Sequence, residues 1–175
     1  MSTQKLSTRQ ILEQNLQRTA PASLQRTSIL LHNVRSMHNV GAAFRSADAF
    51  GISRILLSGF TPAPPRPEIS KTAIGAEKHV EWEQLDGKDA IAALKQTVTL
   101  IGVEQTSQSV LLPDYQPPVS RDLCLLFGNE VTGIDEELFP HIDAFVEIPQ
   151  YGHKHSLNVS VSIGVVLYAM LQKFW

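Results

Sequence analysis

The sequence predicts an α/β fold in which a parallel sheet is flanked by helices on both faces. Short apolar segments alternate with segments of helical spacing along most of the chain. The apolar segments are continuous runs, such as LCLLF, and do not alternate with polar residues. Continuous apolar strands are typical of parallel sheets that are covered on both sides. With 175 residues, the chain is expected to form one compact domain with a short appendage.

The appendage is expected at the N-terminus, as a helical extension of residues 1–27 ahead of a main domain at 28–175. Residues 7–17 have apolar side chains at helical spacing, with a possible cap at Ser7 or Thr8. This helix is expected to end before Pro21.

The main domain is expected to begin with a buried strand at 28–33, a loop, and a helix at 39–50. Asn39 can cap that helix, and Gly51 is its natural stop. A second short apolar strand is expected at 55–57.

A proline-rich stretch follows and is expected to be an exposed loop, because four of the six residues 62–67 are proline. Beyond it the patterns predict, in order, a helix at 88–96, strands at 98–103 and 123–127, a short helix from Asp135 to about Pro140, a strand at 145–148, and a helix from Ser156 to the C-terminus.

The last helix is apolar on two sides. One side carries Leu157, Val161, Val165 and Tyr168, and the other carries Val159, Ile163, Val166 and Met170. In a domain of this size, the second side is more easily covered by another subunit than by the same chain, so we expect a homodimer. The alternative is a helix buried entirely within its own core.

Composition limits the function classes. The net charge of −2 argues against binding nucleic acid by bulk charge, so such a role would need a local patch. No apolar run is long enough to cross a membrane and no leader is evident, so a cytoplasmic location is expected. The single Cys124 lies in an apolar run and is expected to be a buried thiol, with a catalytic nucleophile as the alternative.

Three polar segments follow apolar strands, at the sheet edge where open parallel sheets hold ligands. They are NVRSMHNVGAAFRSADAFG, LLFGNEVTG and EIPQYGHKHSLNVSV. Each has an ordinary interpretation, since Arg45 can be a solvated surface arginine, Glu130 can face solvent from a tight turn, and Ser156 can cap a helix. The glycine spacing fits neither the dinucleotide fingerprint nor the P-loop.

A metal site is not expected from these segments. The run His153, Lys154, His155 lacks a nearby cysteine or a clear carboxylate partner, so it is a poor zinc signature. A basic cluster beside a helix N-terminus is better suited to an anion such as phosphate.

Together the three segments resemble the signature motifs of the SpoU (TrmH-type) branch of the SPOUT methyltransferases. The matching patterns are N-x5-R from Asn39, FGNE-x2-G from Phe127, and IP-x2-G-x3-SLNVSV from Ile148. The resemblance extends over about residues 28–171. It implies the α/β-knot fold, a parallel sheet with a C-terminal trefoil knot, and it implies a homodimer.

The resemblance also implies an enzyme that transfers a methyl group from S-adenosyl-L-methionine (AdoMet) to a ribose 2′-hydroxyl of RNA. Since no separate RNA-binding domain is evident, tRNA is favoured over rRNA. The alternative is a catalytically inactive RNA-binding or ribosome-assembly homologue of the same fold. A base-methylating SPOUT enzyme is disfavoured, because the N-x5-R and SLNVS patterns belong to the ribose-modifying branch.

By position, the resemblance implies that AdoMet is bound by Gly128, Ile148 and Leu157. The polar set that it implies around the ribose is Arg45, Asn39, Glu130, Ser156 and Asn158, and all five are present, which favours an active enzyme. A guanidinium is always charged in proteins, so Arg45 is interpreted as a group that stabilises the developing alkoxide and holds the adjacent phosphate, and a general base is the alternative.

Overall fold

The computed structural model describes residues 3–174. Its centre is a seven-stranded sheet in the order β3-β2-β1-β6-β4-β7-β5, and every strand pair is parallel. The strands are β1 (Thr27–His32), β2 (Arg54–Ser58), β3 (Glu81–Leu85), β4 (Val98–Val103), β5 (Val110–Leu111), β6 (Asp122–Phe127) and β7 (Ala144–Glu147). The parallel sheet predicted from the continuous apolar runs is confirmed.

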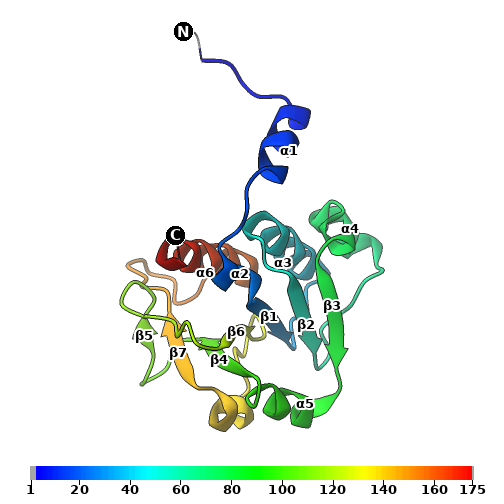
Figure 1. Cartoon of the computed structure of the whole chain (residues 1–175). Coiled ribbons are helices and arrows are strands. Elements are labelled where there is room, and N and C mark those ends of the chain that lie inside the picture. The colour runs from blue at the N-terminus through cyan, green and yellow to red at the C-terminus, as the bar shows by residue number, and fades with distance from the viewer. Residues whose placement is uncertain (1–2, 175) are drawn as a thin grey trace.

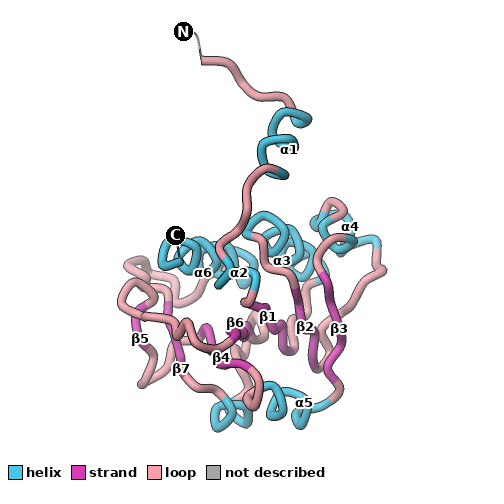
Figure 2. Tube along the Cα trace, viewed as in Figure 1, coloured by secondary structure: helices cyan, strands magenta, loops and turns pink. Residues whose placement is uncertain are grey.

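Helices cover both faces of this sheet (Figures 1 and 2). One face carries α2 (Ala22–Gln25), α3 (Met37–Phe50), α4 (Pro67–Ala73) and α6 (Val159–Phe174), with the short 3-10 helix η1 (Ala76–Lys78) beside them. The other face carries α5 (Gly87–Leu94) and the 3-10 helix η2 (Glu136–His141).

The two faces form two separate cores, and this explains why the strands are apolar throughout. In β1, Ile29 and Leu31 belong to the core beneath α3 and α6, whereas Leu30 belongs to the core beneath α5 and η2. All three side chains are fully buried. Since successive residues of a strand point to opposite faces, a sheet covered on both sides needs an apolar residue at every position.

The N-terminal arm forms the expected helix, α1 (Thr8–Leu16), which stands clear of the body (Figure 1). Ser7 and Gln10 form a capping box at its start, and none of its residues is buried. The following α2 is different, because Leu24 is fully buried and joins the larger core. The division of the chain at residue 27 stays a prediction.

The sequence patterns missed five elements, namely the short helices α2 and η1, the helix α4, and the edge strands β3 and β5. The edge strands β3 and β5 have no buried residue, so they lack the apolar run by which the central strands were found. Helix α4 begins at Pro67, inside the stretch expected to be a loop. The first helical position suits proline, because the N–H that proline lacks would have no partner there.

Two helix starts differ from those predicted. Helix α3 begins at Met37, and the cap is Ser36, whose hydroxyl accepts a hydrogen bond from the backbone N–H of Asn39 at 3.3 Å. Helix α6 begins at Val159, and Asn158 caps it through a 2.8 Å bond from the Ser160 N–H. Ser and Asn are both good caps, so the pattern alone does not choose among neighbours. The side chains of Asn39 and Ser156 are therefore not helix caps.

Helix α6 is covered on one side only within this chain. Ile163, Val166 and Met170 are fully buried, whereas Val161 and Tyr168 are 50% and 53% exposed. The alternative, in which this helix is buried entirely within the core of its own chain, is therefore wrong.

The lone cysteine is buried as expected. Burial raises the pKa of the Cys124 thiol to about 11, so the thiol is protonated near neutral pH. Within residues 3–174, no group of three or more His, Cys, Asp or Glu side chains is arranged to hold a metal ion. No helix in the same span has the length and apolar content needed to cross a membrane.

A glycine in α3 allows close contact with α4. A Cβ at Gly41 would overlap the Thr72 hydroxyl and the Ile69 carbonyl oxygen, so we expect Gly41→Ala to lower the free energy of unfolding by about 1–3 kcal/mol. Gly164 in α6 has open space around its Cβ position, and Gly164→Ala is expected to raise stability by about 0.5–1 kcal/mol through helix propensity. Urea denaturation of both variants measures the difference, and equal effects would contradict the close approach.

Candidate active site

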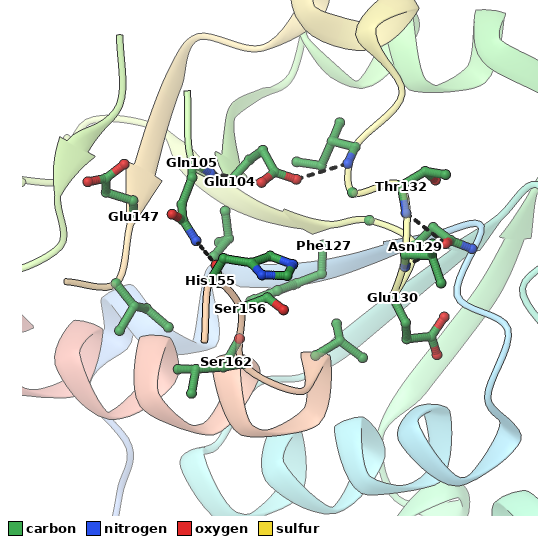
Figure 3. Close-up of a pocket in the computed structure, with 18 of the residues that line it drawn as sticks. Glu104, Gln105, Phe127, Asn129, Glu130, Thr132, Glu147, His155, Ser156 and Ser162 are labelled. Atoms are coloured by element: carbon green, nitrogen blue, oxygen red, sulfur yellow. Dashed lines mark hydrogen bonds between the residues drawn. The ribbon is translucent and has the colours of Figure 1, made fainter. Parts of the chain in front are cut away.

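A cavity of about 490 Å³ opens at the carboxyl ends of β4, β6 and β7 (Figure 3). This volume lies within the range of roughly 300–1,000 Å³ that is common for small-molecule sites. The main lining segments are the end of β4 (103–105), the loop after β6 (127–134), the end of β7 (147–148), the loop before α6 (155–157), and Val159 and Ser162 of α6.

The loop after β6 is a tight turn built around glycine. The backbones of Asn129 and Gly133 exchange two hydrogen bonds, at 2.9 and 3.0 Å. A Cβ at Gly128 would overlap the Gly133 carbonyl group, and Gly133 itself has φ +71°, so both positions require glycine. The Asn129 side chain accepts hydrogen bonds from the N–H groups of Val131 and Thr132.

Glu130 extends from this turn to the start of α3. One of its carboxylate oxygens accepts hydrogen bonds from the Ser36 N–H at 3.0 Å and the Asn39 side-chain amide at 2.9 Å, and the other accepts the Arg35 N–H at 2.9 Å. Burial disfavours the charged form, but these donors outweigh burial and the pKa of Glu130 is lowered. A carboxylate at a helix N-terminus is also favoured by the helix dipole.

The three sequence motifs are connected through side chains. Asn39 donates to Glu130 through its amide nitrogen, and its amide oxygen accepts a 3.3 Å hydrogen bond from Asn158. A second cavity lies beside the first, lined by Arg35, Ser36, Asn39, Glu130 and Val131. One polar chain, Glu130–Asn39–Asn158, therefore joins the loop after β6, helix α3 and the start of α6.

The structure brings together most of the residues singled out in the sequence. The first cavity is lined by Gly128, Glu130, Ile148, Ser156 and Leu157. Asn39 lines the second cavity, and Asn158 contacts Asn39.

Arg45 lies apart from this group. It is exposed on α3, lines neither cavity, and makes no hydrogen bond or ion pair within residues 3–174. His153 and Lys154 are also exposed and line neither cavity, whereas His155 lines the first.

Sequence reasoning missed several polar residues beside the cavity. Glu104 and Gln105 follow β4, and Glu147 ends β7. The pattern that could have identified them is polar residues directly after apolar strands. Glu104 and Gln105 reach the cavity because β4 lies between β6 and β7 in the sheet. A local sequence pattern does not contain this strand order.

A buried polar cluster supports the same edge of the sheet. His32 lies 2.7 Å from the Ser58 hydroxyl and 3.0 Å from the Asp135 carboxylate, which also accepts a hydrogen bond from Asn33. Ser58 is only 2% exposed, so the cluster does not present a nucleophile to a substrate. It ties β1 and β2 to the residue that precedes η2.

The first cavity is acidic. Its described lining includes the carboxylates of Glu104, Glu130, Glu136 and Glu147 and no lysine or arginine. Such a site favours a ligand with positive charge and disfavours polyphosphates.

The sequence matches the SpoU rRNA Methylase family over residues 26–168. The chain belongs to this family. A tRNA (guanosine(18)-2′-O)-methyltransferase of Thermus thermophilus is 30% identical over 167 residues, which cover 91% of this chain and 79% of that protein. The 23S rRNA (guanosine-2′-O-)-methyltransferase RlmB of Neisseria meningitidis is 30% identical over 141 residues, 79% of this chain. The match spans 55% of that relative's length.

Solved structures agree with this membership in the SpoU family. An AdoMet-bound rRNA methyltransferase from Sinorhizobium meliloti superposes with a TM-score of 0.80 at 28% identity, covering 91% of this chain and 62% of that one. A TrmH/SpoU tRNA modifying enzyme of A. aeolicus has a TM-score of 0.75 at 24% identity, which supports the fold.

The hydrogen bonds to Glu130 predict a pH-dependent contribution to stability. The lowered pKa means that this contribution is present above the unfolded-state pKa of about 4.3 and is lost as the pH falls through the lower folded-state value. We expect Glu130→Gln to lower the free energy of unfolding by about 1–2 kcal/mol at pH 7, and the gap to the unsubstituted protein to narrow in acid.

Denaturation at pH 7 and at a series of acid pH values measures this gap. Glu81→Gln, at an exposed position of the edge strand β3, is the control and should change stability by less than about 0.5 kcal/mol throughout. A gap for Glu130→Gln that stays constant down to acid pH would contradict the role of its charge.

Proposed function

We propose that this SpoU-family protein is an AdoMet-dependent RNA methyltransferase that modifies a ribose 2′-hydroxyl. The observation that carries the proposal is that the segments at 127–134 and 148–157 line one cavity, while the Glu130–Asn39–Asn158 chain joins the third segment, at the start of α3, to both of them. The family relatives named above are guanosine 2′-O-methyltransferases of tRNA and 23S rRNA, which supports the same reaction here.

The cavity fits AdoMet as its ligand. Ile148 and Leu157 offer apolar walls for an adenine ring, and the glycine turn at 128–133 exposes backbone close to the cavity. AdoMet carries a net positive charge, which suits the acidic lining. When bound, AdoMet supplies an electrophilic methyl group on its sulfonium.

The chain's own residues then position the acceptor. Glu130 holds Asn39 at the start of α3, and Asn39 holds Asn158, so these groups keep a fixed polar edge beside the cavity. Ser156 lines the cavity and is exposed, so its hydroxyl can contact the ribose. In the transfer, the 2′-oxygen forms a bond to the methyl carbon as the carbon–sulfur bond breaks, S-adenosylhomocysteine leaves, and the hydroxyl proton passes to water. The chain's residues therefore need to align the 2′-oxygen and stabilise its developing charge.

Arg45 is proposed to stabilise that charge and to hold the adjacent phosphate. Because Arg45 lies outside the cavity of its own chain, the proposal requires either the RNA strand or the cavity of a second subunit to reach it. The same location is the observation that favours the second candidate, a homologue that binds RNA without modifying it.

The uncovered side of α6 supports a homodimer. In α6, the side chains of Val161, Val165 and Tyr168 are 40–53% exposed. Helix α6 packs beside α3, and α3 carries Arg45. A second subunit on this side would bury the apolar residues and lie close to α3. The trefoil knot and a cytoplasmic location are part of the same proposal, which membership of the SpoU family supports.

The preferred substrate is tRNA. The Thermus tRNA enzyme matches this chain over 79% of its length, so a protein of similar extent acts on tRNA. The test is to incubate the protein with labelled AdoMet and either bulk tRNA or bulk rRNA, and then to map the label by alkaline hydrolysis. Mapping is possible because a 2′-O-methyl group protects its phosphodiester from cleavage. Absence of label in both RNA pools would reject the enzyme and leave the binding homologue.

The role of Arg45 predicts a separation of binding from transfer. We expect Arg45→Ala to lower the rate of methyl transfer by about 100-fold or more, while AdoMet affinity measured by calorimetry stays unchanged. Arg121→Ala is the matched control. Arg121 is an exposed arginine that precedes β6, so it lies at the amino end of that strand, whereas the cavity lies at the carboxyl ends. Near-normal transfer by Arg45→Ala would reject the assignment.

If α6 forms the dimer interface, one charged side chain on its uncovered side should separate the subunits. Val165→Glu places a carboxylate on the uncovered side, and we expect it to convert a dimer to a monomer in size-exclusion chromatography with light scattering. Val119→Glu, at an exposed position that is 72% accessible in a loop, should leave the dimer intact. A monomeric unsubstituted protein would overturn this part of the proposal.

A further inference from the structure

The carboxyl end of β4 lies between the two loops that form the cavity. In the sheet, β4 pairs with β6 on one side and with β7 on the other. The residues directly after β4 are Glu104 and Gln105, and both line the cavity although they belong to none of the three sequence motifs (Figure 3). This placement puts them in reach of the glycine turn after β6 and of the loop that precedes α6.

Glu104 holds the glycine turn. One carboxylate oxygen accepts a 3.1 Å hydrogen bond from the Ile134 N–H, and the other accepts a 2.8 Å bond from the Gln105 N–H. The carboxylate lies against the backbone of Gly133, where a Cβ would overlap it. The backbone N–H of Glu104 is itself bonded to the Val146 carbonyl of β7, so the side chain extends from a fixed point.

Gln105 holds the loop before α6. Its side-chain amide donates a 2.7 Å hydrogen bond to the backbone carbonyl of His155, as the dashed line in Figure 3 shows. Within residues 3–174, this is the one hydrogen bond made by any residue of the loop 150–157. That loop contributes Ser156 and Leu157 to the cavity, and most of its side chains are exposed.

We propose that Glu104 and Gln105, here called the β4 brace, are positioning residues for the methyl donor. Adjacent residues of one strand end hold the two loops on either side of the cavity, so the distance between these loops is set before the donor binds. The inference rests on the proposed function, because it assigns the cavity to AdoMet. A preformed site binds more tightly, since the loops lose less conformational freedom on binding.

The primary test is calorimetric binding of AdoMet and of its demethylated product, S-adenosylhomocysteine. Gln105→Ala removes the one hydrogen bond of the loop, and we expect it to weaken both ligands by roughly three- to tenfold. Gln105→Glu should not restore affinity, because a carboxylate has no N–H to donate to the His155 carbonyl. Gln108→Ala is the control, since Gln108 lies in the same segment but does not line the cavity.

Glu104 variants add a graded comparison. Glu104→Ala removes both acceptors, whereas Glu104→Gln keeps one, so the loss of affinity should be larger for alanine. Equal weakening of the two ligands supports positioning. Weakening of AdoMet alone would overturn the proposal for Glu104, because it would mean that the carboxylate attracts the positive charge of the donor. Since Gln105 is exposed, its variants keep the test available if a Glu104 variant does not fold.

Two further measurements separate positioning from a general structural role. Backbone order parameters measured by NMR should fall at residues 150–157 in Gln105→Ala, with no change in the melting temperature beyond that of Gln108→Ala. In steady-state assays, KM for AdoMet should rise, while KM for RNA and kcat at saturating donor stay unchanged. Unchanged donor affinity in both Gln105→Ala and Glu104→Ala would overturn the brace, whereas failure of the unsubstituted protein to bind AdoMet would overturn the proposed function and the brace together.

Discussion

The carboxylate of Glu130 is the interaction on which the arrangement of the site depends. It accepts three hydrogen bonds from the start of α3 while its own backbone belongs to the turn after β6. These two segments are more than 90 residues apart in the chain. Because the donors are two backbone N–H groups and the Asn39 amide, the contact fixes both the position of α3 and the orientation of Asn39. Loss of the carboxylate group would leave these donors unpaired in a partly buried place, which is unfavourable for the fold as well as for the site.

The strand order explains why residues from such distant segments meet. Strands β1, β6, β4 and β7 are neighbours in the sheet although the chain visits them in another order, so their carboxyl ends form one continuous edge. The loops that follow these strands must then share the same space. Each loop is held by its neighbours: Asn129 donates to the Asn33 carbonyl, Asp135 accepts from Asn33, and Glu104 accepts from Ile134.

Much of the central fold could be predicted from the sequence, because β1, β2, β4, β6 and β7 are apolar on both faces and leave a strong local signal. The strand β3 could not, since its sequence EWEQL lies at the edge of the sheet and has no buried residue. The caps of α3 and α6 are Ser36 and Asn158, three residues before and two residues after the predicted caps Asn39 and Ser156, because several good capping residues stand close together in each segment. The motifs indicated Glu130, Ser156 and Leu157 for the cavity, which they line. Glu104 and Gln105 could not be found this way, because their importance arises from the position of β4 between two other strands.

The hydrogen bond that holds the loop at 150–157 runs to a backbone carbonyl and not to a side chain. Any amino acid at position 155 offers the same carbonyl, and the neighbouring side chains of Tyr151, His153 and Lys154 are exposed and bear no part of the attachment. Mutation can therefore vary the outward chemistry of this segment without loosening it from the sheet. The exposed side chains of this loop can therefore change in evolution while the loop itself stays ordered, and this allows new recognition surfaces to evolve over an unchanged interior.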